Sequence, residues 1–320
     1  MTSEQAARQA DGTLVAQRDA PIGGQAVLEG VMMRGVSTWA VAVRKPDESV
    51  DVQSFPFVSV LRRHKLLRLP VVRGAVALFE SLGIGFKALG IAANAQLGED
   101  EEELSGKAWT GTIIVALSLS VGLFFLLPAV LTNLSGAGSD NGIVFVVVEK
   151  VIRISIFLGY LWLISRMKDL QRVFQYHGAE HKTISCYEAG LDLTPDNAQR
   201  FSRLHPRCGT SFLLIVMIVS VFVFAPFGKL DWHWLLISRV FGIPLVAGLA
   251  FEAIKWFGRN RAKQWARWLM WPGLQLQRLT TREPDVAQLA VAIAALEAVL
   301  AVETFDTVDE ADKLGIEVAA

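Results

Sequence analysis

The chain has 320 residues, of which 52% are hydrophobic and only 19% are charged. Soluble domains contain about 25% charged residues, so the composition favours a membrane protein. The 31 basic residues balance the 31 acidic ones, which argues against a nucleic-acid-binding protein, and two cysteines are too few for a disulfide scaffold. Residues 1–20 contain no apolar run of signal-peptide length, so we expect a disordered leader on the cytoplasmic side.

Residues 21–60 are predicted to form a small, strand-rich cytoplasmic cap. Two extended runs in TWAVAVRKPDESVDVQSF lie on either side of Pro46-Asp47, which is a turn signal. The preceding segment, GGQAVLEGVMMRG, has four glycines but no phosphate-loop spacing, so we interpret it as a glycine-punctuated strand edge. Residues 61–98 are apolar but interrupted by charges, which favours cytoplasmic or interfacial helices, and residues 99–107 are expected to form an acidic linker.

Four apolar segments are long enough to cross the hydrocarbon core of a bilayer, which is about 30 Å thick. They comprise residues 108–131, 143–165, 210–228 and 232–254. The second segment contains Glu149, Lys150 and Arg153, and the fourth contains Arg239. Such segments span a membrane only if their charges pair or face the interior of the helix bundle. We therefore predict an α-helical membrane protein with four transmembrane helices.

The distribution of basic residues predicts the orientation of the chain. Residues 166–209 and the C-terminal region are rich in Lys and Arg, whereas the other two connections contain only Lys229. Cytoplasmic connections carry an excess of these residues, so both termini and residues 166–209 are expected in the cytoplasm. In the C-terminal region we expect a basic, Trp-rich interfacial helix at 255–273, a cytoplasmic helix at 285–304 and a tail at 305–320.

The segment 166–209 also contains most of the side chains that can bind a metal. His177 and His181 of HGAEH lie one helical turn apart, a spacing that lets two imidazoles bind one zinc ion. Glu180 completes an H-x-x-E-H pattern, the inverted zincin order, in which the glutamate acts as a general base rather than as a ligand. The pattern therefore predicts a zinc site with a base beside it.

A third ligand has to come from another part of the chain. We prefer His205, then Cys208, because both lie on a loop that can fold back, and then Glu252 near the cytoplasmic end of the last span. Glu188 is rejected because it lies about 10.5 Å along a straight helix from the HGAEH pair. If all the histidine and cysteine candidates bind, the site is closed and structural, whereas an open position permits catalysis.

Charges inside the predicted spans form a second candidate site. They are Glu149, Lys150, Arg153, Arg239 and Glu252. Glu149 and Arg153 are i,i+4 partners, and Glu149 and Arg239 lie at similar depths in their segments, so either pair can form. We favour structural pairing of these charges over a pathway for protons or ions.

Three motifs make the sequence resemble the YqhQ family. They are GGQAVLEGVMMRG, YHGAEHKTISCYEAG and HPRCGTSFL, and the resemblance covers about residues 20–305. It implies a protein of the bacterial cytoplasmic membrane with a domain of unknown function, usually described as a predicted metal-dependent enzyme. The family's motif positions are His177, Glu180, His181, Cys186, Glu188, His205 and Cys208.

Three functions are compatible with these features. The first is a zinc-dependent hydrolase at the cytoplasmic membrane face, with Glu180 as the base and a peptide or a lipid headgroup as the substrate. The second is a non-enzymatic scaffold or assembly factor with a structural His/Cys cluster. The third is a small transporter, which rests on the intramembrane charges and requires a homo-oligomer to enclose a path. The lipid bilayer is the expected partner in all three cases.

Overall fold

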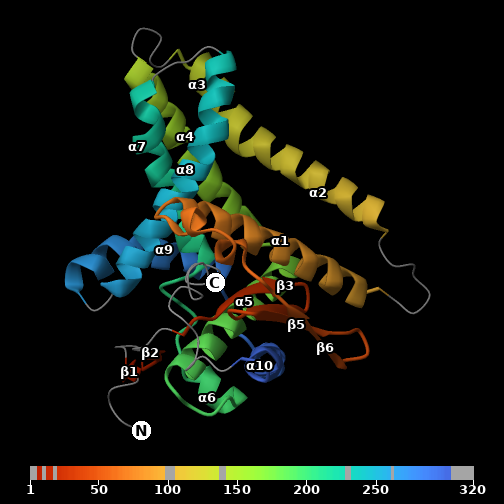
Figure 1. Ribbon diagram of the computed structural model, residues 1–320. Helices are drawn as coiled ribbons and strands as arrows, with labels where there is room; N and C mark the ends of the chain where they lie inside the picture. Colours follow the sequence, from red (N-terminus) through yellow and green to blue (C-terminus); the bar gives the residue numbers. More distant parts are fainter. Residues whose placement is uncertain are drawn as a thin grey trace.

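The computed structural model describes residues 6–8, 12–16, 20–97, 105–136, 142–227, 232–260 and 263–303. A group of upright helices lies above a small β-sheet that has helices on both faces (Figure 1). The tail predicted at 305–320 and most of the acidic linker predicted at 99–107 lie outside the described residues.

The sheet is an antiparallel meander of four strands in the order β3 (Gly23–Val27), β4 (Gly30–Arg34), β5 (Thr38–Arg44) and β6 (Val50–Pro56). The predicted strand-rich cap is thus confirmed, and its β5–β6 hairpin turns at Pro46-Asp47. Side chains of β4 and β5 are buried on both faces, which explains why these strands are almost continuously apolar.

Two different layers cover the faces of the sheet. On one face Met32, Val41 and Val43 pack against α1 (Val72–Ala95), which follows the short 3-10 turns η1 (Val60–Arg62) and η2 (Lys65–Arg68). On the other face lie α5 (Lys168–Glu188) and α10 (Val286–Leu300), together with the short α6 (Pro195–Gln199). A capping box between Asp285 and Gln288 begins α10. The sheet therefore holds α5, and the HGAEH motif on it, in a fixed position.

Two short strands lie where a disordered leader is expected. β1 (Ala6–Arg8) pairs with β2 (Leu14–Ala16), and the side chains of Leu14 and Ala16 are buried. The backbone of Leu14 donates to the carbonyl of Arg200 and accepts from Ser202. The leader differs from the expectation because its apolar residues join the core beside α6.

The upright helices are α3 (Leu127–Leu134), α4 (Gly142–Ile164), α7 (Gly209–Phe224) and α8 (Trp232–Arg259). α2 (Gly106–Val121) continues through a π-helical turn, η3 (Gly122–Leu126), into α3, and it leans away from the other helices (Figure 1). The turn η4 (Ala225–Phe227) ends α7, and α9 (Gln264–Thr280) packs against the other end of α7.

Among the described residues, four helices are long and apolar enough to cross a membrane: Val72–Ala95, Gly106–Leu134, Gly209–Phe227 and Ile237–Phe257. The last three correspond to predicted spans. The first is α1, expected as an interfacial helix, whereas α4, expected as a span, is excluded by its three charged residues. α1 crosses the base of the upright helices and packs between α8 and the sheet (Figure 1). α4 lies among the upright helices and contacts α3 and α7.

Candidate metal centre

Three side chains from two distant parts of the chain meet at one point below the upright helices. His177 and His181 come from consecutive turns of α5, and Cys208 is the residue that precedes α7. One possible ligand atom of each lies within 4.8 Å of the others. His181 and Cys208 are fully buried, and His177 is half-buried. Two nitrogens and one sulfur are a donor set that zinc commonly uses in proteins.

The orientation of both histidines is set by main-chain carbonyl groups. Nδ1 of His177 lies 2.8 Å from the oxygen of Thr280, and Nδ1 of His181 lies 2.6 Å from the oxygen of Arg203. Because a carbonyl oxygen can only accept a hydrogen bond, each Nδ1 carries the proton and donates it. Each Nε2 is then the ring atom that faces away from the carbonyl group and can offer a lone pair. This is how metal-binding histidines are usually held.

The other contacts of the three side chains leave their donor atoms able to bind a metal ion. Nε2 of His181 is buried without a hydrogen-bond partner in the described part of the chain. Sγ of Cys208 lies 3.3 Å from Nε2 of His177 and 3.1 Å from Oγ1 of Thr210. Burial lowers the pKa of His181 and so favours the neutral ring. Burial opposes ionisation of Cys208, but its contacts with His181 and Thr210 outweigh this and lower the pKa of the thiol.

Glu180 lies on the same helix and is also buried, with a relative exposure of 1%. Apart from a backbone contact with Ala26, the carboxylate oxygens have no hydrogen-bond partner among the described residues. Burial raises the pKa of Glu180 to about 8. A side chain at Gly24 would place its Cβ 2.8 Å from the Glu180 side chain, so the glycine lets strand β3 approach this carboxyl group. The GGQAVLEGVMMRG motif, through Gly24, therefore contacts the YHGAEHKTISCYEAG motif at Glu180.

His205 lies beside the three side chains but outside their cluster. Its ring centroid is 5.6 Å from that of His181, and its Nε2 lies 3.5 Å from Glu188. Arg207 forms a buried ion pair with the same carboxylate, which also accepts a hydrogen bond from the backbone of Ala20. Burial opposes ionisation of Glu188, but Arg207 holds its pKa below the usual range. His205, which we ranked first for the third ligand, is thus engaged with Glu188, and Cys208, which we ranked second, lies with the two histidines.

The other candidates also lie outside the cluster. Glu252 forms an ion pair of 2.5 Å with Arg73 of α1. Cys186 is buried near the carbonyl oxygen of Asp192, 3.6 Å away, and burial raises the pKa of its thiol to about 11. Such a cysteine is a packing residue rather than a reactive thiol.

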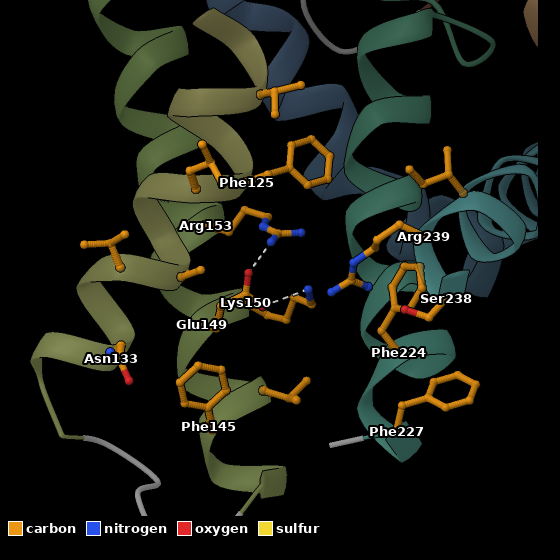
Figure 2. A pocket seen from close by; sticks show the side chains of 16 residues that line it. Phe125, Asn133, Phe145, Glu149, Lys150, Arg153, Phe224, Phe227, Ser238 and Arg239 are labelled. Atoms are coloured by element: carbon orange, nitrogen blue, oxygen red, sulfur yellow. Dashed lines mark hydrogen bonds and ion pairs between the residues drawn. The ribbon is translucent and has the colours of Figure 1, made fainter. Parts of the chain in front are cut away.

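Of the five charges predicted inside the spans, all but Glu252 gather in one place (Figure 2). Glu149 pairs with Arg153 and with Lys150, and all three line a cavity that Arg239 of α8 also faces. The pair between Glu149 and Arg153 is the within-helix alternative of the sequence analysis.

Two glycines are part of the site although the sequence analysis gave them no role there. Gly24 makes space for Glu180, as described above, and an added Cβ at Gly178 would lie only 2.1 Å from the carbonyl oxygen of Arg282. Gly178 thus lets α5 approach the residues that follow α9. Thr280, the last residue of α9, accepts the hydrogen bond that holds His177. The glycines inside GGQAVLEG and HGAEH were the available signal, because a glycine inside a strand or a helix often marks a close approach.

Comparisons with known proteins agree with the resemblance. Residues 69–302 match the family described as "Protein of unknown function (DUF1385)". The chain is 35% identical over 295 residues to a protein of Bacillus subtilis (strain 168), named "Uncharacterized protein YqhQ", and the match covers 88% of this chain and 92% of that protein. No solved structure matches. The chain therefore belongs to the YqhQ family, whose function is not known.

Proposed function

We propose that the protein is a membrane-embedded, zinc-dependent hydrolase that cleaves an ester or amide bond presented at the cytoplasmic face of the bacterial inner membrane. The observation that carries the proposal is the meeting of His177, His181 and Cys208 beside the unpartnered carboxyl group of Glu180. Substrates of this kind include a lipid headgroup ester and a peptide bond close to the membrane.

The donor set fits a catalytic rather than a structural zinc ion. Structural zinc sites usually have four protein ligands, whereas catalytic sites have three and keep one position open. Here three ligand atoms converge, and the fourth candidate, His205, is engaged with Glu188. Both imidazoles already point a lone pair toward the cluster, so little reorganisation is needed on binding.

The protein residues then have separate roles. His177, His181 and Cys208 would hold the ion, which when bound would supply Lewis acidity to the substrate carbonyl group and to water. Beside a bound cation the pKa of the Glu180 carboxyl group would fall from its raised value, and the carboxylate would then accept a proton from the attacking water and return it to the leaving group. This carboxyl group is close to the metal ligands, and apart from a backbone contact with Ala26 its oxygens have no hydrogen-bond partner among the described residues.

The proposed membrane arrangement puts the metal centre next to the lipid surface. We assign α2–α3, α4, α7 and α8 to the membrane, and α1 and α9 to its cytoplasmic surface. The contacts of α1 with the sheet and the charged cavity on the inner side of α4 support this assignment. Cys208 precedes α7 directly, so the ligands lie where that helix would leave the membrane.

The test is the zinc content of detergent-purified protein, measured by mass spectrometry. We expect about one zinc ion per wild-type chain, as three-ligand sites hold, and almost none in the His177→Ala/His181→Ala variant. The variant His64→Ala/His233→Ala is the matched control, because it removes two histidines that lie outside the cluster and should keep the metal.

The catalytic part is tested with Glu180→Gln. This variant should keep its zinc but lose hydrolysis of chromogenic esters and fluorogenic peptides in mixed micelles. Equal zinc in the wild type and the His177→Ala/His181→Ala variant would contradict the metal centre. Absence of zinc from every sample would instead favour the scaffold, and a partner would then be sought on the cytoplasmic cap.

A further inference from the structure

A second site lies at the other end of the upright helices, away from the sheet. A cavity of about 610 Å³ is lined mainly by η3, α3, α4, the end of α7, η4 and the first half of α8 (Figure 2). α3 ends and α4 and α8 begin near it, so it lies close to the end of the bundle opposite the metal centre (Figure 1). Nothing in the proposed hydrolysis uses this cavity.

The charges in the cavity do not balance. Lys150, Arg153 and Arg239 are cationic, whereas Glu149 is the one acidic residue among those that line it. Nζ of Lys150 lies 2.8 Å from Glu149, and Arg153 pairs with the same carboxylate. One negative charge is thus shared by two cations, and with Arg239 the lining has a surplus of two positive charges.

Arg239 is the cation that is left over. In the part of the chain that the structure describes, its guanidinium has no ion pair and lies over the ring of Phe224, 4.0 Å from the ring centroid. Figure 2 shows it on the opposite wall from Arg153, with Lys150 between them. Taking charges out of water is costly unless an opposite charge compensates them. The three cations around one space therefore form a site that lacks an anion.

The rest of the lining is suited to a hydrocarbon chain. Apart from Asn133 and Ser238, the uncharged lining side chains are apolar. Several residues at the rim, among them Leu126, Val130 and Phe227, are more than half exposed, so the cavity is accessible from the surroundings of the bundle. If these helices cross the bilayer, those surroundings are lipid.

We propose that this cavity binds the phosphate group of an anionic lipid, with part of an acyl chain against the apolar wall. Guanidinium groups hydrogen-bond phosphate in a bidentate manner, and two of them with one ammonium group would surround it from both sides. The surplus of positive charge distinguishes an anionic lipid from a zwitterionic one, and the apolar wall distinguishes a lipid from free phosphate. The site is independent of the metal centre.

The test is native mass spectrometry of delipidated protein in dodecyl maltoside. Three probes are compared: phosphatidylglycerol, phosphatidylcholine with the same acyl chains, and inorganic phosphate. We expect the wild type to retain phosphatidylglycerol about tenfold more tightly than phosphatidylcholine, and Arg239→Gln to lose about that factor, since each cation contributes on the order of 1 kcal/mol or more to such contacts. Arg239→Lys, which keeps the charge, should retain most of the preference.

The matched control is Arg166→Gln, which removes an arginine that lies over Trp162 near the opposite end of α4 and should leave lipid binding unchanged. If Arg239→Gln does not fold, Ala129→Phe is the second variant, because it fills the cavity and leaves the charges in place. Circular dichroism and a monodisperse elution profile establish that each variant is folded.

The outcomes separate the alternatives. Loss of the phosphatidylglycerol preference in Arg239→Gln or in Ala129→Phe, but not in Arg166→Gln, supports the proposal. Equal retention of the two lipids by the wild type overturns it, as does a preference that neither cavity variant reduces. If inorganic phosphate binds and prevents retention of phosphatidylglycerol, the cavity is a site for a free anion, and the proposal that it binds a lipid is overturned.

Discussion

The metal centre and the charged cavity differ in how their polar groups are held. Around the metal centre the ligand rings and the neighbouring acid have fixed partners: Thr280 and Arg203 hold the two imidazoles, and Arg207 holds Glu188. In the cavity, one carboxylate serves two cations, and Arg239 lies over the ring of Phe224 with no ion pair among the described residues. The first region is organised by the chain itself, whereas the second is incomplete as it stands.

In both regions some buried polar groups have no partner within the described part of the chain. Near the metal centre they include the Nε2 of His181 and the two oxygens of Glu180, groups that bind a cation or accept a proton. In the cavity they are cations. Buried polar groups in folded proteins are nearly always partnered, so clusters of exceptions are informative. The two proposals therefore place a cation at one end of the molecule and an anion at the other.

The largest effect is expected from removing the ion pair that organises the region next to the metal centre. Arg207→Met leaves Glu188 buried without its cation and should lower the free energy of unfolding by about 3–5 kcal/mol. Thermal unfolding in detergent measures the change. Arg172→Gln is the control, because this ion pair with Glu29 is largely exposed and contributes at most about 1 kcal/mol. Similar melting temperatures for the two variants would show that the buried pair does not organise the loop.

A smaller effect is expected from the glycine inside the HGAEH motif. Gly178→Ala forces α5 away from the carbonyl group of Arg282 and should cost about 1–3 kcal/mol, as overpacking usually does. Because the same shift moves His177, zinc content should fall as well. Gly83→Ala is the matched control: nothing lies within 4 Å of its added Cβ, so alanine should be neutral or stabilise the helix by up to about 1 kcal/mol. Full zinc content in a stable Gly178→Ala protein would contradict the role of this close approach.

The local parts of the metal centre could be predicted from the sequence, and the non-local parts could not. That His177 and His181 share a face follows from helical periodicity alone. The choice between His205 and Cys208 depends on which way a loop turns, and the contact of His205 with Glu188 decides it. The role of Gly24 is visible only when β3 lies against α5, since nothing in the spacing of the two segments relates them.

The same limit applies to the apolar helices. By length and composition, α1 qualifies as a membrane span and α4 does not, because the number of charged residues is considered but not the direction of their side chains. In the structure the charges of α4 face a cavity between helices, and α1 has the sheet on one side. The sequence analysis predicted four spans that include α4 and a surface position for α1, and that assignment remains a prediction.

The smallest effect sharpens the contrast between the two regions. Glu149→Gln removes the one acidic group of the cavity lining and leaves three cations, but they line a cavity that is accessible from the surroundings of the bundle, so a smaller loss of stability than in Arg207→Met is expected in neutral detergent. Added phosphatidylglycerol should restore the melting temperature of this variant and raise it more than that of the wild type, because a ligand stabilises the state that binds it more tightly.

Glu252→Gln is the matched control for this last experiment. It removes an acidic residue from α8 that pairs with Arg73 and does not line the cavity, so its loss of stability should not respond to the lipid. A response to phosphatidylglycerol that is equal in the two variants would mean that the lipid stabilises the helices in general. A response confined to Glu149→Gln would mean that the cavity requires negative charge, and that the carboxylate of Glu149 supplies only part of it.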